Sequence, residues 1–173
     1  MPLPTYLDGW RSLGTASWRH DTDGVAAGPS DRTGFLVSPE NHGDFVLSVE
    51  FWIDAQTNSG VFIRCGEVET LEQLNPFDCY EVNIFDQHPQ QENRTGAVVF
   101  VVKPVARVDT AGRWNTLEIR AQGEDIEIRV NGTHTATLTD ARTAPGPVAL
   151  QYGGPGVVRF RRLRIDDELI ATD

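Results

Sequence analysis

The chain has 173 residues, and its 15 basic against 25 acidic side chains give it a formal net charge of -10. A binding face for nucleic acid needs clustered cations, and this charge balance argues against one. No run of 18 apolar residues is present, so the sequence predicts no segment that spans a membrane. A chain of this length is expected to form a single domain over residues 1–173.

The chain start and the cysteines bear on the cellular compartment. Residues 1–6 lack the charged segment followed by an apolar stretch that marks a secretory signal, so we expect a cytoplasmic location. Cys65 and Cys79 are too few for a zinc site or a disulfide scaffold. In a reducing compartment two buried thiols are the preferred prediction, and a cross-strand disulfide is the alternative.

Strands and turns are predicted almost throughout. Segment 45–53 has an apolar residue at every second position, the pattern of a half-buried strand. Segments 114–120 and 125–130 alternate in the same way. Asn131-Gly132 follows at once and suits a type I′ hairpin, because both residues tolerate positive φ.

The rest of the chain continues the pattern. The continuous apolar run 97–102 predicts a central strand, and 148–152 and 157–165 predict two more. The arginine-rich residues 159–164 are interpreted as a solvated edge strand rather than a polyanion site. Only Val68 to Leu74 offers a short helix candidate. About ten or more short strands separated by turns predict an all-β antiparallel sandwich or jelly roll.

Polar side chains gather on two of the predicted strands. In segment 58–64, alternation places Arg64 on the face away from the core. In segment 80–86, it places Glu81 and Asn83 on that face. If the two strands pair, all three side chains converge on one rigid sheet surface, where a small polar ligand such as a sugar can be held.

Seven motifs follow one another along the chain, and we list them in order: Gly43-Asp44-Phe45, Asn58 to Arg64, Tyr80 to Asp86, Gly112 to Asn115, Val130-Asn131-Gly132, Gly146 to Gln151 and Val158 to Ile165. In this order and at these spacings, the chain resembles the 3-keto-disaccharide hydrolase family over about residues 10–165. The resemblance implies a two-sheet antiparallel jelly-roll sandwich of the concanavalin A-like lectin/glucanase type.

The resemblance also implies a sugar-binding cleft and cleavage of glycosides already oxidised at C3. The family's site positions carry over to Asn58, Ser59, Arg64, Glu81, Asp86 and Gln151. His88, in the loop after Asp86, resembles a histidine-proline step of the family. The chain departs from the family pattern at Asn83, where glutamine is usual, at Gln90, where aspartate often stands, and at Val99-Phe100, which replace a tyrosine region. These departures concern the choice of substrate.

A 3-keto group makes the C2 proton acidic, because the resulting carbanion delocalises into the carbonyl as an enolate. Loss of that proton expels the leaving group at C1, and addition of water gives net hydrolysis. Such a site needs a base, support for the enolate oxygen and an acid for the leaving oxygen. Glu81 or His88 is the expected base, and Arg64 is the expected cation beside the enolate oxygen.

The remaining side chains are expected to bind substrate. The side chains expected to form hydrogen bonds with sugar hydroxyls are Asn58, Ser59, Asn83, Asp86 and Gln151. The ring of Trp52 or Phe62 is expected to stack on the sugar. Two structural alternatives stand beside these roles. Arg64 and Glu81 form a cross-strand ion pair in one, and Asp86 caps the following loop in the other. No cofactor is certain, and a divalent metal held by His88, Glu81 and Asp86 is an option that their spacing does not test.

Two other function classes compete with this hydrolase or lyase. A conventional glycosidase needs two carboxylates on either side of the bond, and Glu81 and Asp86 face opposite sides of one strand, so it is disfavoured. A non-catalytic carbohydrate-binding module fits the same fold. The expected partners are a small sugar or glycoside and an oxidoreductase that supplies the ketone, with no nucleic acid and no membrane.

Overall fold

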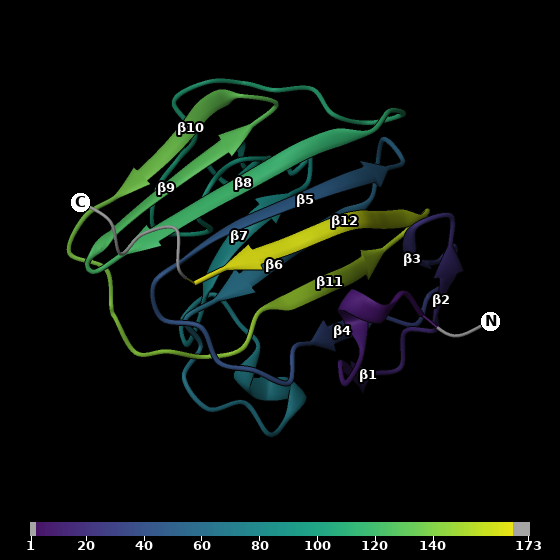
Figure 1. Ribbon diagram of the computed structural model, residues 1–173. Coiled ribbons are helices and arrows are strands. Elements are labelled where there is room, and N and C mark those ends of the chain that lie inside the picture. The colour runs from purple at the N-terminus through teal and green to yellow at the C-terminus, as the bar shows by residue number, and fades with distance from the viewer. Residues whose placement is uncertain (1–2, 168–173) are drawn as a thin grey trace.

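The computed structural model describes residues 3–167 and shows two antiparallel β-sheets packed face to face (Figure 1). The five-stranded sheet has the order β1 (Arg11–Gly14), β4 (Gly34–Val37), β11 (Ala149–Gly154), β6 (Asn58–Ile63) and β7 (Tyr80–Ile84). The seven-stranded sheet has the order β10 (Thr133–Leu138), β9 (Asp125–Val130), β8 (Asn115–Gln122), β5 (Phe45–Ile53), β12 (Val158–Asp166), β3 (Gly24–Ala27) and β2 (Trp18–Asp21). The expected all-β jelly-roll sandwich is confirmed.

Helical structure in the described part of the chain is confined to three short 3-10 turns, which are η1 (Thr5–Leu7), η2 (Leu71–Gln73) and η3 (Gln91–Asn93). None of the helices among residues 3–167 is long and apolar enough to cross a membrane. Within the helix candidate Val68 to Leu74, only the single turn η2 forms.

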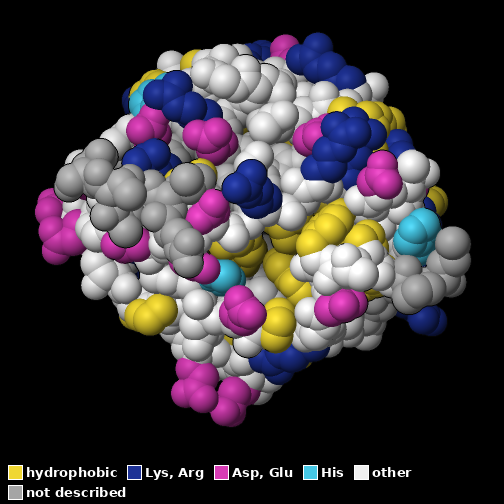
Figure 2. Space-filling model, in the orientation of Figure 1, with side chains coloured by type: hydrophobic (Ala, Val, Ile, Leu, Met, Phe, Trp, Pro, Cys, Tyr) yellow, Lys and Arg dark blue, Asp and Glu magenta, His cyan; other side chains and the backbone are white. Residues whose placement is uncertain are grey.

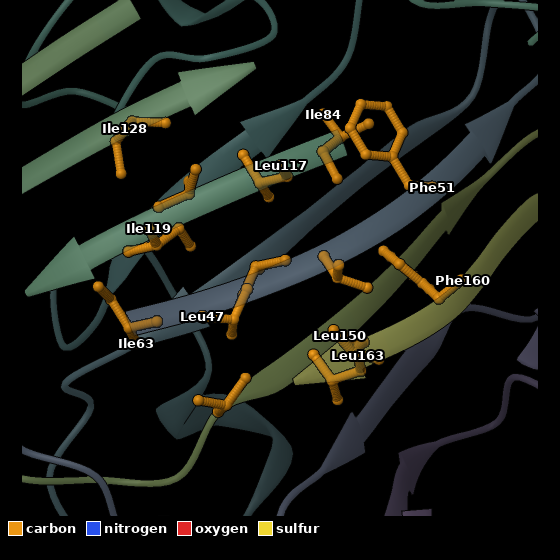
Figure 3. Packing of buried hydrophobic residues seen from close by; sticks show 14 of the residues in the cluster. Leu47, Phe51, Ile63, Ile84, Leu117, Ile119, Ile128, Leu150, Phe160 and Leu163 are labelled. Atoms are coloured by element: carbon orange, nitrogen blue, oxygen red, sulfur yellow. The ribbon is translucent and has the colours of Figure 1, made fainter. Parts of the chain in front are cut away.

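The core lies between the two sheets and is built by strict alternation. Strand β5 buries every second residue from Phe45 to Ile53, as its sequence predicts. Figure 3 shows Leu47 and Phe51 of β5 packed among side chains from both sheets, such as Ile84 and Leu150. Each such side chain contributes about 1.5–3 kcal/mol when fully buried. This core fixes which face of every strand points outward.

Local turn chemistry agrees with the sequence at the hairpin of β9 and β10. Asn131 and Gly132 have φ values of 53° and 79°, the left-handed conformation that a type I′ turn requires at both central positions. Strand β10 pairs with β9 directly after this turn. The hairpin prediction is therefore confirmed.

Two strand predictions were wrong in position. Residues 97–102 form no named strand but run along the free edge of β7, where the Asn83 N–H donates to the Ala97 carbonyl at 2.9 Å and the Val99 N–H donates to the Glu81 carbonyl at 3.0 Å. Strand β12 lies between β5 and β3, so the arginine-rich run is not an edge. Periodicity shows that a strand is buried on one face, but long-range pairing decides its neighbours.

The outer face of the seven-stranded sheet carries charges of both signs, which Figure 2 shows interspersed. The Arg161 guanidinium donates to Glu50 at 2.9 Å, and the Arg159 guanidinium donates to Asp21 at 2.6 Å. Both guanidinium groups also lie over the ring of Trp114. These arginines therefore pair with neighbouring acids and rings.

The loop between β6 and β7, residues 64–79, covers part of the outer face of the five-stranded sheet. In Figure 1 it is the teal segment at the bottom of the molecule. Its Val68 and Leu74 belong to a small apolar cluster that includes Phe62 of β6. A disulfide between Cys65 and Cys79 closes the loop, so the preferred prediction of two free thiols was wrong.

Candidate functional site

The candidate site is the outer face of β6 and β7, where strand register brings together residues that are distant in the chain. Glu81 pairs with Phe62, and Asn83 pairs with Gly60. Val82 lies between Glu81 and Asn83 in the chain and points into the core. Because successive side chains alternate across a strand, Glu81 and Asn83 point outward beside Phe62 and Gly60.

Glu81 lies in apolar surroundings. Its neighbour on one side is Phe62, and on the other side Val99 binds its carbonyl through the main chain. Among the described residues, the Glu81 carboxyl group has no hydrogen-bond or ion-pair partner that would hold the charged form. Burial therefore raises the pKa of Glu81 to about 7. A carboxylate with this pKa can accept a proton near neutral pH, as a general base must.

Two amide oxygens near Glu81 lack partners. Asn83 is 2% exposed, and its Nδ2 donates to the Asn93 carbonyl at 2.5 Å, but its Oδ1 has no partner within residues 3–167. The Gln151 Oε1 on β11 is also buried and unpaired there. An unsatisfied buried acceptor costs about 1–3 kcal/mol. The hydroxyl groups of a sugar are donors of the kind that both oxygens lack, although neither oxygen is exposed on the surface.

Two glycines shape the floor of this face. A Cβ atom at Gly60 would lie 3.4 Å from the Gln151 Oε1 and 3.1 Å from the Val82 carbonyl oxygen. A Cβ atom at Gly153 would lie 2.5 Å from the Nδ2 of Asn58, so the missing side chain leaves room for that amide. Strand pairing thus brings four of the predicted residues onto one face: Asn58, Glu81, Asn83 and Gln151.

The structure does not place Arg64 on this face, and that prediction was wrong. Arg64 has φ of 51°, which ends the alternation of β6 and turns the side chain away. Its side chain is 0% exposed, and the guanidinium donates to the carbonyls of Gly43, Gly123 and Arg142 and to Asp44. These contacts use all five N–H donors, so neither support of an enolate oxygen nor an ion pair with Glu81 fits this geometry.

Ser59 and Asp86 also have structural partners. The Ser59 hydroxyl is fully buried and donates to the Gln151 carbonyl at 2.6 Å. The Asp86 carboxylate accepts hydrogen bonds from the Thr95 and Thr110 hydroxyls and from the N–H groups of Thr110 and Ala111. The expected contacts of Ser59 and Asp86 with sugar hydroxyls were therefore wrong, and the loop-capping alternative for Asp86 holds.

Trp52 and His88 lie outside the central face. Trp52 is on β5 of the other sheet, beside Arg159, so it does not line a site at Glu81. His88 lies in the turn after β7, where its Nδ1 accepts the Gln90 N–H at 3.0 Å and its ring packs edge-on against Phe85. That hydrogen bond assigns the ring proton to Nε2, which makes neutral His88 a donor on its free side rather than a base.

Residues 3–167 contain no group of three or more His, Cys, Asp or Glu side chains placed to hold one ion. The divalent-metal site that the sequence left open is therefore not formed by His88, Glu81 and Asp86.

Comparison with known families identifies one that matches nearly the whole chain. A family model described as the 3-keto-alpha-glucoside-1,2-lyase-like domain matches residues 5–166. The chain belongs to this family. No curated protein matches the sequence at a significant level.

Solved structures show that this member of the family shares its fold with proteins whose names refer to carbohydrates. Two crystal structures from Parabacteroides distasonis ATCC 8503, provisionally assigned as glycosyl hydrolases, are 20% and 18% identical to it. They cover 92% of this chain in both cases and 100% and 88% of their own, with TM-scores of 0.74 and 0.75. A carbohydrate-binding module from Bacillus subtilis, CBM66, is 16% identical over 95% of this chain and 99% of its own, with a TM-score of 0.71. At these identities, the likeness shows the fold alone.

Sequence reasoning did not find two residues that help to form the site of this family member. Val99 lies beside Glu81, and Asn93 holds the Nδ2 of Asn83 and accepts the Phe100 N–H at 3.0 Å. The apolar run 97–102 was the available signal for Val99, but it was assigned to a central strand. Asn93 had no signal, because its contacts depend on a loop that packs against β7.

Proposed function

We propose that the outer face around Gly60 binds a 3-keto-glycoside and that Glu81 removes its C2 proton. The observation that carries this proposal is a carboxyl group with no partner among the described residues, with its pKa raised by burial to about 7, beside two unpaired amide oxygens. Family membership supports the same substrate class. A conventional pair of catalytic carboxylates is not needed for this chemistry.

The reaction follows from the acidity of C2. The Glu81 carboxylate takes the proton, and the electrons of the C–H bond form an enolate with the C3 carbonyl. The enolate then re-forms the C3 carbonyl as the C1–O bond breaks, leaving a double bond between C1 and C2. The leaving oxygen takes a proton, which completes the lyase reaction. Addition of water, with its hydroxyl at C1 and its proton at C2, makes the sum a hydrolysis.

The other residues of the face are assigned by their hydrogen-bonding capacity. Asn83 Oδ1 and Gln151 Oε1 accept from sugar hydroxyls, which satisfies two buried acceptors at once. Asn58 supplies amide N–H donors towards the substrate from the start of β6. His88 lies in the turn after β7, beyond the amides, and is assigned no role in the reaction. Because Arg64 does not reach this face, the enolate oxygen depends on neutral N–H donors such as the amide of Asn58.

A binding module without turnover is the second candidate function. The observation in its favour is that every N–H donor of Arg64 is used within the protein, which removes the cation expected beside the enolate. The fold is also that of the carbohydrate-binding module CBM66. Both candidates place a sugar on the same face, so binding alone does not separate them.

The experiment that tests the proposal is product analysis by mass spectrometry. The protein is incubated with 3-keto-α-glucosides and with the unoxidised parent glucosides, with and without divalent metal and chelator. Release of aglycone from the keto forms alone supports enolate chemistry, and the ketone then requires an oxidoreductase as the preceding enzyme. Intact keto substrates together with measurable binding would support the binding module.

A further inference from the structure

Two phenylalanine side chains stand out from the surface beside the candidate site. Phe77 is 71% exposed and Phe100 is 62% exposed, although both are large apolar residues. Their rings stack on each other with centroids 5.8 Å apart and planes inclined by 21°. Val101, which follows Phe100, is 47% exposed and extends the apolar surface. Exposed apolar surface of this kind is characteristic of binding sites.

The backbone holds this aromatic pair in place. The Phe77 N–H donates to Asn75 Oδ1 at 2.9 Å, and its carbonyl accepts from Arg142 at 2.7 Å. Phe100 has φ of 64°, an unusual conformation for a bulky residue, and its N–H donates to Asn93 Oδ1. Backbone strain of this type concentrates at functional sites.

Chain order and backbone pairing connect the pair to the N-terminal side of Glu81, whereas Asn83 lies on its C-terminal side. Phe77 comes four residues before Glu81 in the chain, and the N–H of Val99, the residue before Phe100, binds the Glu81 carbonyl. Asn83 follows Glu81 on the opposite side. Along β7 the order is therefore an aromatic surface, the candidate base and then the unpaired amide oxygens.

This order matches the layout of a glycoside whose C2 proton lies at Glu81. C1 is bonded to C2, so the leaving group departs directly beside the base, whereas the other sugar hydroxyls extend away from it. We propose that the Phe77–Phe100 pair is the binding surface for the leaving group and that it selects flat, aromatic aglycones. This inference rests on the proposed function, and it adds the aglycone class to it.

The test compares two 3-keto-α-glucosides that differ only in the aglycone, phenyl or methyl. Phe77→Ala and Phe100→Ala are each expected to lower kcat/KM for the phenyl glycoside about three- to tenfold, the range for loss of one aromatic contact. For the methyl glycoside the change should stay below about twofold. Comparing each variant with wild type on the same substrate removes the difference between phenol and methanol as leaving groups. The matched control is Val105→Ala, another exposed apolar side chain, whose N–H binds Thr135 of the other sheet.

The outcomes separate the two proposals. Equal losses on both substrates, or no loss on the phenyl glycoside, would overturn the aglycone surface while leaving the lyase proposal intact. If the wild type cleaves neither substrate, the proposed function is wrong. Calorimetric titration with phenyl and methyl α-glucosides then tests whether the Phe77–Phe100 pair binds an aromatic group. Weaker binding of the phenyl compound alone in Phe100→Ala would then support an aromatic binding site, and equal binding would refute it.

Discussion

Glu81 and Phe62 are paired across β7 and β6, so a carboxyl group projects from the sheet directly beside a buried aromatic ring. The loop of residues 64–79 packs Val68 and Leu74 into the cluster that contains Phe62. Water is thereby kept from one side of the carboxyl group, and this desolvation raises its pKa. The same pairing explains how a surface strand can hold a carboxyl group with a pKa of about 7.

Replacing Glu81 with glutamine should abolish most of the turnover of a 3-keto-glycoside. The side chain keeps its size but can no longer accept the C2 proton, and loss of a general base typically costs about 10²–10⁴-fold. Steady-state kinetics and deuterium exchange at C2 measure the effect. The matched control is Glu118→Gln on the outer face of β8, which should leave kcat/KM unchanged. If kcat/KM of Glu81→Gln falls by less than about tenfold, Glu81 is not the base.

The pH dependence of activity and of stability should change in opposite directions through Glu81. The charged form is the base, so kcat/KM is expected to rise about tenfold per pH unit up to about 7 and then level off. The folded protein holds the Glu81 proton more tightly than the unfolded chain, whose glutamate pKa is about 4.3. The contribution to the free energy of unfolding is therefore fully present at low pH and is lost as pH rises through about 7.

Chemical denaturation of wild type and Glu81→Gln at pH 4, 5.5 and 8 isolates that contribution. The difference between the two proteins should change by about 3–4 kcal/mol over this range, because one pKa unit corresponds to about 1.4 kcal/mol. A difference that stays constant with pH would show that the carboxyl group is as well solvated in the folded protein as in the unfolded chain.

Much of the sheet structure could be predicted from sequence, because alternation and turn chemistry are local. The burial of β5 and the Asn131-Gly132 hairpin both depend on periods of two and on residues that tolerate positive φ. Arg64 shows where this reasoning ends. A left-handed residue at the end of β6 reverses the direction of the side chain, and the carbonyls that receive it come from three distant loops. Periodicity contains no information about such contacts.

Arg64 is therefore predicted to affect stability rather than catalysis. Arg64→Ala leaves three carbonyls and Asp44 without their donors, and breaking a buried charged contact typically costs about 3–5 kcal/mol. Arg120→Ala, at an exposed position of β8, is the control and should change the free energy of unfolding by less than about 0.5 kcal/mol. Thermal unfolding followed by circular dichroism measures both. An Arg64→Ala variant with unchanged Tm and greatly reduced kcat would show that Arg64 takes part in the reaction.

Removal of the Cys65–Cys79 disulfide should loosen the loop that covers Phe62, with two separable effects. Cross-linking residues 14 apart lowers the entropy of the unfolded chain, so the Cys65→Ala/Cys79→Ala variant is expected to lose about 3 kcal/mol of unfolding free energy. A looser loop also admits water to Glu81, so the pKa in the kcat/KM profile should fall from about 7 towards the ordinary glutamate range. Reductant added to wild type should reproduce both changes, and it should not alter the variant. A stability loss with an unchanged kinetic pKa would show that the sheet itself, through Phe62 and Val99, suffices to desolvate the carboxyl group.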